Sequence, residues 1–225
     1  FHDALCGCIS PCAYRDVMDR YAAAEEELAR ALRRMSGDRE PRAFFNPLPR
    51  ARGGVAALPD DGRAVSAGGE VPPQAALDGV LYVKLPPVAG LGSVPFERVP
   101  GRKPEELRPC DAGIQNEYYR VSVRDGVPEI FSEASGLSLR GAGLPVIRED
   151  AGGFWSARPT GRERALAPGW CRAERGGPLS RIVVGGCAEG VPWDESLRCE
   201  WELELRLFEG TDRVDLLFRA DWHGR

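Results

Sequence analysis

The sequence has 225 residues, a formal net charge of −4, 43% hydrophobic residues and 28% charged residues. This length can bury one large core or two small ones, and the composition is typical of a globular protein, not of a disordered chain. A nucleic-acid-binding protein normally carries a basic excess that neutralises phosphates, and this sequence has none. No apolar run approaches the length needed to cross a bilayer. We therefore expect neither nucleic acid nor a membrane as a partner.

The cysteine count bears on the cellular compartment. There are seven cysteines, an odd number, and their spacing does not outline a disulfide framework. A chain of this length needs no disulfide scaffold, so we expect reduced thiols and a cytoplasmic location, with secretion as the alternative. Because the sequence begins at Phe1 and not at Met, and ends directly after a strand-like run, we also expect a fragment of a longer protein.

Residues 1–40 are predicted to contain a long amphipathic helix. Ser10 can cap its first amides, Pro11 suits the first helical position, and Gly37 ends it. The apolar side chains that recur at helical spacing are Tyr14, Val17, Met18, Tyr21, Leu28, Leu32 and Met35. A single helix cannot bury such a stripe by itself, so it needs partner helices or a sheet.

Residues 41–110 are expected to be a linking region of loops and short strands. Proline and glycine interrupt this stretch repeatedly, and short apolar runs such as Val80–Leu85 lie between them. The segment Gly53–Gly69 is poor in large apolar residues, so we expect it to be a mobile surface excursion.

Residues 111–225 alternate between apolar and polar positions, which is typical of strands with one buried face. In the first predicted hairpin, Asp125 and Gly126 form the turn, and the strand residues are Tyr119, Val121, Val123, Ile130 and Phe131. In the second, Glu209–Asp212 forms the turn, and the apolar positions are Trp201, Leu203, Leu205 and Leu207 before it and Val214, Leu216, Phe218, Ala220 and Trp222 after it. We expect Trp201 and Trp222 to be buried, and Glu200, Glu202, Glu204 and Arg206 to form a solvent-facing side.

The fold class follows from these elements. Two long one-sided hairpins indicate an antiparallel sheet packed on another layer, most simply a β-sandwich. No βαβ alternation and no glycine-rich phosphate loop is present, which argues against a nucleotide-binding α/β domain. The sequence therefore predicts a mainly β protein with an N-terminal α-helical segment and a β-sandwich in residues 111–225, truncated at its C-terminus.

Candidate catalytic residues are few, because the sequence has only two histidines, His2 and His223. A group formed by His2, Cys6, Cys8 and Cys12 is open to two interpretations, a soft zinc site or small residues at a turn around Gly7. Its spacing is not that of a known zinc knuckle, which favours the turn. A glycosidase needs two carboxyl groups on either side of the scissile bond, and no pair can be chosen from the sequence alone.

Several strings, in order, resemble glycoside hydrolase family 38 α-mannosidases. The first, Phe1-His2-Asp3-Ala4-Leu5-Cys6-Gly7-Cys8, is similar to a motif that closes the family's catalytic site ahead of a helical region. The helix from Pro11 with Arg20-Tyr21 and Glu25-Glu26-Glu27-Leu28 resembles the family's next element. The later strings are Phe45-Asn46-Pro47-Leu48-Pro49-Arg50, Gln115-Asn116-Glu117-Tyr118-Tyr119-Arg120-Val121, Glu209-Gly210, Arg213-Val214-Asp215 and Asp221-Trp222-His223.

The resemblance implies a zinc-dependent retaining α-mannosidase that hydrolyses terminal α-mannosides in oligosaccharides, through a covalent intermediate. It implies that His2 is a zinc ligand and that Asp3 accepts hydrogen bonds from sugar hydroxyls. The departures matter, because the other zinc ligands, the nucleophile and the general acid of the family lie in a preceding catalytic barrel that this sequence lacks. The isolated chain is therefore expected to be inactive.

A second interpretation is a non-catalytic β-sandwich that binds carbohydrate or supports a neighbouring domain, since sandwiches host many functions. An upstream coding region with a His-x-Asp zinc pair and a catalytic aspartate would favour the enzyme, whereas a start codon near Phe1 would favour the binding or scaffolding domain. The sequence leaves open which linkage is cleaved and whether the parent is a homo-oligomer.

Overall fold

The structure, a computed structural model, describes residues 11–36, 43–111, 113–152 and 156–223. The chain divides into two compact units, of which the first comprises Phe1–Arg42 and Arg148–Arg162 and the second Ala43–Ile147 and Glu163–Arg225. The finer division of the sequence at residues 40 and 110 stays a prediction.

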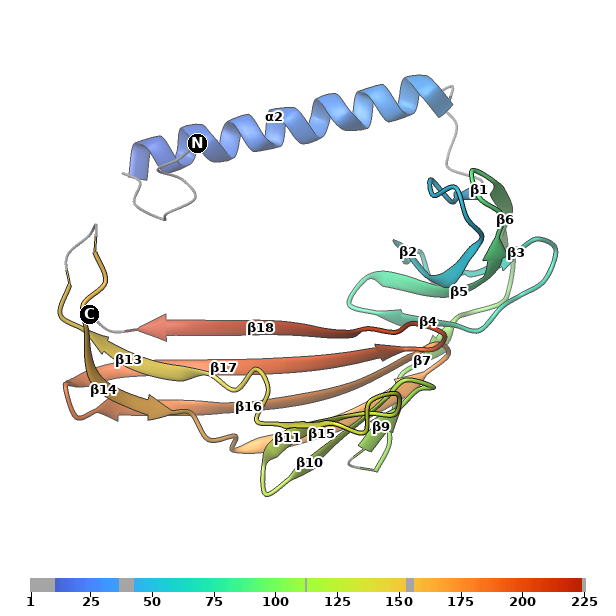
Figure 1. Cartoon of the computed structure of the whole chain (residues 1–225). Coiled ribbons are helices and arrows are strands. Elements are labelled where there is room, and N and C mark those ends of the chain that lie inside the picture. The colour runs from blue at the N-terminus through green and yellow to red at the C-terminus, as the bar shows by residue number, and fades with distance from the viewer. Residues whose placement is uncertain (1–10, 37–42, 112, 153–155, 224–225) are drawn as a thin grey trace. The chain divides into compact units, whose positions relative to one another are not determined.

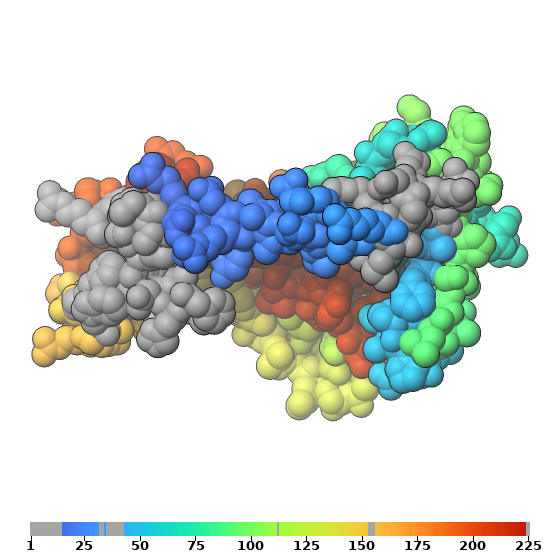
Figure 2. Space-filling view, turned by 90° about the horizontal axis from the view of Figure 1, so that it is seen from above, coloured from blue at the N-terminus to red at the C-terminus, as the bar shows by residue number. Residues whose placement is uncertain are grey.

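In the first unit, helix α2 (Pro11–Ser36) has the bounds that the sequence predicts. It begins at the proline, whose missing N–H costs nothing at a helix start, and it stops just before Gly37. Much of the predicted apolar stripe is uncovered, because Met18, Tyr21 and Leu28 are exposed; Figure 2 shows this helix surface in blue. No described helix is long and apolar enough to pass through a membrane.

The strands β13 (Val146–Asp150) and β14 (Pro159–Ala165) pair in a two-stranded sheet. Glu149 holds the pair together, because one of its carboxylate oxygens accepts a 2.5 Å hydrogen bond from the Thr160 hydroxyl and the other a 2.7 Å bond from Arg162. These contacts are exposed, so we expect each to contribute little to stability.

In the second unit, two antiparallel sheets share one core and form the predicted β-sandwich (Figure 1). The large sheet has the order β18 (Val214–His223), β17 (Asp194–Phe208), β16 (Leu179–Val191), β15 (Trp170–Gly176) and β8 (Arg108–Pro109). The small sheet has the order β12 (Ser138–Arg140), β11 (Val127–Ser132), β10 (Tyr119–Arg124) and β9 (Gly113–Gln115). Ile114, Val121 and Ile130 of the small sheet join one cluster with Ile182, Trp201 and Leu205 of the large sheet.

Both predicted hairpins are present. Asp125 and Gly126 connect β10 to β11 with φ angles of 53° and 75°, as a tight hairpin turn requires, and Arg124 pairs with Val127. Strands β17 and β18 pair from Leu207 with Val214 to Arg198 with His223, around the predicted turn.

Two further sheets are built from residues 43–106. One has the order β1 (Ala43–Phe45), β6 (Ser93–Val99) and β3 (Ala64–Ala67), and the other β2 (Arg52–Pro59), β5 (Val80–Val88), β4 (Gln74–Leu77) and β7 (Glu105–Glu106). They share a core around Val65, Leu81 and Val83. The Gln74 side chain links them, because it accepts a hydrogen bond from the Val65 amide and donates one to the Val65 carbonyl.

The prediction of a surface excursion at 53–69 was wrong, because this stretch contains β3 and most of β2. Ala64 and Val65 are fully buried although neither is large. Small side chains pack well where two sheets approach closely, so a shortage of large apolar residues did not mean exposure.

Two predictions about the last hairpin also need correction. Trp201 is buried at 3% exposure, but Trp222 is 48% exposed, although both lie on the same face of the sheet. The predicted alternation along β18 is confirmed, but the predicted burial of Trp222 is wrong, because β18 is the edge strand of the large sheet. Likewise, Glu204 and Arg206 do not face solvent but are 2% and 8% exposed.

Candidate functional site

The side of the large sheet that faces away from the sandwich core carries most of its charge, and we call it the charged face. Its side chains alternate with the core residues, as the strand register requires. Its members are Trp170, Arg172 and Glu174 on β15, Arg181, Gly185 and Cys187 on β16, Arg198, Glu200, Glu202, Glu204 and Arg206 on β17, and Asp215, Arg219, Asp221 and His223 on β18.

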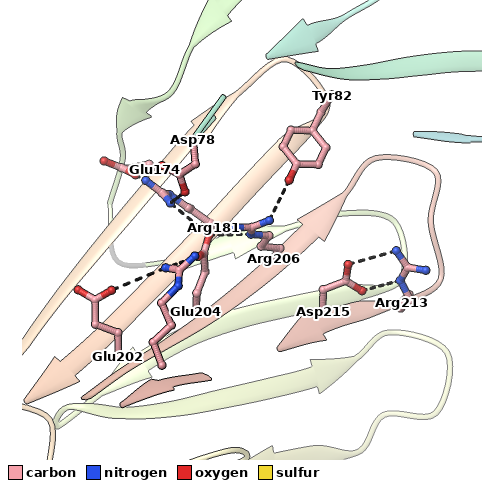
Figure 3. A network of polar contacts seen from close by, with 10 residues as sticks. Asp78, Tyr82, Glu174, Arg181, Glu202, Glu204, Arg206, Arg213 and Asp215 are labelled. Atoms are coloured by element: carbon pink, nitrogen blue, oxygen red, sulfur yellow. Dashed lines mark hydrogen bonds and ion pairs between the residues drawn. The ribbon is translucent and has the colours of Figure 1, made fainter. Parts of the chain in front are cut away.

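One end of the charged face is a buried ion network centred on Glu204 (Figure 3). The Glu204 Oε1 atom accepts a 2.7 Å hydrogen bond from Arg206 Nε and a 3.2 Å bond from Arg181 Nη1. Arg181 Nε also donates a 2.7 Å bond to Glu174. Arg219 Nη1 lies 3.8 Å from the second Glu204 oxygen. Each carboxylate oxygen of Glu204 therefore has at least one arginine nearby.

The pKa shifts follow from this packing. Burial alone would raise the pKa of Glu204, but the hydrogen bonds and charges of Arg206 and Arg181 outweigh it and hold that pKa below the ordinary value. Burial would lower the pKa of both arginines, but the Glu174 and Glu204 carboxylates raise that of Arg181 and the Glu204 carboxylate raises that of Arg206. All three groups are therefore held in their charged forms.

The network also fastens the sheets of residues 43–106 to the large sheet. The Arg206 Nη1 atom donates a 2.9 Å hydrogen bond to the Tyr82 hydroxyl of β5, and Asp78 lies 3.9 Å from Arg181 (Figure 3). The Tyr82 and Phe208 rings are 5.4 Å apart, in a tilted arrangement. Because the oxygens of Glu204 already have partners, the network suits a structural role better than proton transfer.

The other end of the charged face is a hollow of about 630 Å³. Its lining residues are Gly169, Trp170, Gly186, Cys187, Glu200, Trp201, Glu202, Arg219, Ala220 and Asp221. Trp170, which is 40% exposed, lies against Gly185, where an added Cβ would come within 2.3 Å of the indole Cζ2 atom. Only glycine at position 185 lets the indole lie so close to the sheet. The hollow thus has an aromatic wall, a backbone floor and charged side chains.

The residues assigned from the sequence resemblance, His2 and Asp3, lie outside the described residues. In the alternative zinc group, Cys6 and Cys8 also lie outside the described residues, as does the side chain of Cys12. Within the described parts of the chain, no three side chains of histidine, cysteine, aspartate or glutamate converge to hold a metal. The described thiols Cys110, Cys171, Cys187 and Cys199 are free.

Sequence reasoning missed both ends of the charged face. A signal for the network was present in Glu204-Leu205-Arg206, where opposite charges two residues apart share one side of a strand and can pair. A signal for the hollow was the glycine pair Gly185-Gly186 inside a strand, because glycine within a strand often marks a close approach of another group.

Comparisons with known proteins place the fold. No family model matches the chain, and no curated protein matches its sequence. An α-mannosidase from Enterococcus faecalis V583 is similar in structure, with a TM-score of 0.62 and 11% identity over 96% of this chain and 35% of that one. A glycosyl hydrolase family 38 protein from Enterococcus faecalis gives a TM-score of 0.66 and 10% identity over 96% of this chain and 37% of that one.

The chain thus spans little more than a third of the length of these structures. At this level of identity the similarity establishes the fold. The resemblance to glycoside hydrolase family 38 that the sequence suggests is therefore confirmed for the fold, a mainly β architecture with an N-terminal helix and several antiparallel sheets.

Proposed function

We propose that this chain is a β-rich fragment of a zinc-dependent retaining α-mannosidase of glycoside hydrolase family 38. The observation that carries the proposal is the structural similarity over 96% of the chain to two proteins described as an α-mannosidase and a family 38 glycosyl hydrolase. The ordered sequence strings that resemble the same family point independently in the same direction. The complete protein would hydrolyse terminal α-mannosides in glycans.

In this proposal the chemistry belongs to a catalytic barrel outside the present sequence. His2 would contribute one zinc ligand and Asp3 would accept hydrogen bonds from sugar hydroxyls. The described residues do not supply a metal site, so the remaining zinc ligands, the nucleophile and the general acid would come from that barrel. The described part of the chain would hold the sandwich and the sheets of residues 43–106 in a fixed relation through the Glu204 network.

The location of the complete protein is also part of the proposal. The odd, unpatterned set of seven cysteines favours a reducing compartment, and we propose the cytoplasm.

The experiment uses the complete protein, including whatever sequence precedes Phe1. Purified protein should contain zinc and should hydrolyse 4-nitrophenyl α-D-mannopyranoside. The His2→Ala variant should lose zinc. Loss of an outer-shell partner of a metal ligand lowers activity by about 10- to 100-fold, and the fall in kcat/KM for His2→Ala should be larger than this. Asp3→Asn should keep its zinc and lose turnover, because it removes only an ionised acceptor.

The matched control is His223→Ala, which removes the chain's other histidine, 65% exposed and paired with Asp221. It should leave zinc content and turnover unchanged. Full zinc occupancy with ordinary turnover in His2→Ala would disprove the assignment of the ligand. A complete protein without α-mannosidase activity would disprove the function and favour the non-catalytic alternative.

A further inference from the structure

The hollow on the charged face combines surfaces of two kinds. The Trp170 indole forms an apolar wall, and its position is fixed by the contact with Gly185 and by the Arg172 guanidinium 5.2 Å from the ring centroid. The other walls bear Glu200, Glu202, Asp221 and Arg219, which come from two neighbouring strands. Its volume of about 630 Å³ lies within the range of small-molecule sites.

Two of the three carboxylates in the hollow have an arginine partner, and these partners restrict the ligand. Glu200 forms a 2.5 Å ion pair with Arg198, and Glu202 lies 3.9 Å from Arg219. Asp221 lies 3.3 Å from the His223 imidazole, which carries a charge only when it is protonated. A cationic ligand would therefore compete with Arg198 and Arg219, which are already beside Glu200 and Glu202, and an anionic ligand would meet three carboxylates. A neutral ligand faces neither penalty.

The carboxylates nevertheless keep capacity for hydrogen bonds. An ionised carboxylate offers about four lone-pair sites, and a single ion pair occupies only part of them. Arg219 lies opposite Glu202 on the neighbouring strand and two residues from Asp221 on its own strand, so N–H donors and carboxylate acceptors are adjacent on one wall. Vicinal hydroxyl groups, which both donate and accept, match such a wall. A pyranose ring also has an apolar C–H face, which matches the indole.

We propose that this hollow is a binding site for a neutral pyranoside, with Trp170 stacking on the sugar ring and the carboxylates with Arg219 holding its hydroxyls. The site would bind a sugar residue of a glycan without cleaving it. The choice of a mannoside as the first ligand to test rests on the proposed function, whereas the choice of a neutral sugar rests on the geometry and charge of the hollow.

The test follows the Trp170 indole N–H signal by NMR while methyl α-D-mannopyranoside is titrated into the complete protein. The signal should shift and saturate. Trp170→Ala should weaken binding, measured by calorimetry, by about tenfold or more, as expected for loss of an aromatic contact. Glu202→Gln should also weaken sugar binding, because one ionised hydrogen-bond acceptor of the hollow is lost.

The matched control is Trp222→Ala. Trp222 belongs to the same sheet and is exposed to a similar degree, but it lies on the opposite face. It should leave the affinity within about twofold of the wild type. Choline chloride serves as the cationic probe and should not shift the Trp170 signal.

Three outcomes would overturn the proposal. These are an unshifted Trp170 signal at the solubility limit of the sugar, equal affinity in Trp170→Ala, and a saturable shift with choline but not with the sugar. The proposed function can fail separately from this site. If the complete protein bound the sugar through Trp170 but showed no mannosidase turnover, the binding site would stand and the enzymatic function would be rejected.

Discussion

Arg206 Nε donates a 2.7 Å hydrogen bond to Glu204 Oε1 from two residues further along the same strand, where both residues are buried. A pair this close on one strand forms without long-range closure of the chain. Its burial, however, depends on Tyr82 and Asp78, which are more than a hundred residues away in sequence. The pair therefore reports whether the sheets of residues 43–106 are docked on the large sheet.

We expect Glu204→Gln to lower the free energy of unfolding by about 3 to 5 kcal/mol, because it leaves two buried guanidinium groups without their shared carboxylate. Urea denaturation followed by tryptophan fluorescence measures this. The control is Glu133→Gln, which breaks the exposed ion pair of Glu133 with Arg120 at 2.9 Å and should cost at most about 1 kcal/mol. Equal losses in the two variants would show that Glu204 is not a buried anchor.

The same carboxylate should make stability depend on acidity. The pKa of Glu204 in the folded protein lies below the ordinary value of 4.5. The contribution of the ionised carboxylate to the free energy of unfolding is therefore complete above that value and is lost as the pH falls through the folded pKa. The difference in unfolding free energy between the wild type and Glu204→Gln should thus be constant near neutrality and shrink below about pH 4.5. Parallel urea titrations across this range measure it, and a difference that grows with acidity would contradict the shift.

The two tryptophans of the last hairpin should differ in their contribution to stability. Trp201→Ala should cost about 3 to 5 kcal/mol, because Trp201 lies in the sandwich core. Trp222→Ala should cost much less, because the indole is half-exposed on an edge strand. Thermal and urea unfolding of both variants test this. A loss at Trp222 as large as that at Trp201 would mean that its face is covered in solution.

We expect the 225-residue chain by itself to show no zinc-dependent hydrolysis of an aryl α-mannoside. A catalytic zinc site needs about three protein ligands, and the family motif matched here would supply only His2. The measurement is 4-nitrophenol release with added zinc, beside the complete protein as the positive control. Turnover by the isolated chain that disappears with a chelator would show that it carries its own metal site.

The alternation of residues in the sequence by itself determined much of the sandwich. The period of two in Trp201-Glu202-Leu203-Glu204 allows only a strand with these side chains on opposite faces, and Asp125-Gly126 favours a tight hairpin. The helix from Pro11 to Ser36 was determined in the same local way. In each case the information lies within a few neighbouring residues, so no knowledge of distant contacts was needed.

Only the tertiary structure decided which of those faces are covered. Trp201 and Trp222 share a phase and a face, but Trp201 lies in the sandwich core and Trp222 on an edge strand. Glu204 has the same pattern position as Glu200, but Tyr82 and Asp78 lie over its end of the charged face, where two arginines make its burial tolerable. Burial is a property of what packs against a residue, and those partners come from segments that local periodicity does not identify.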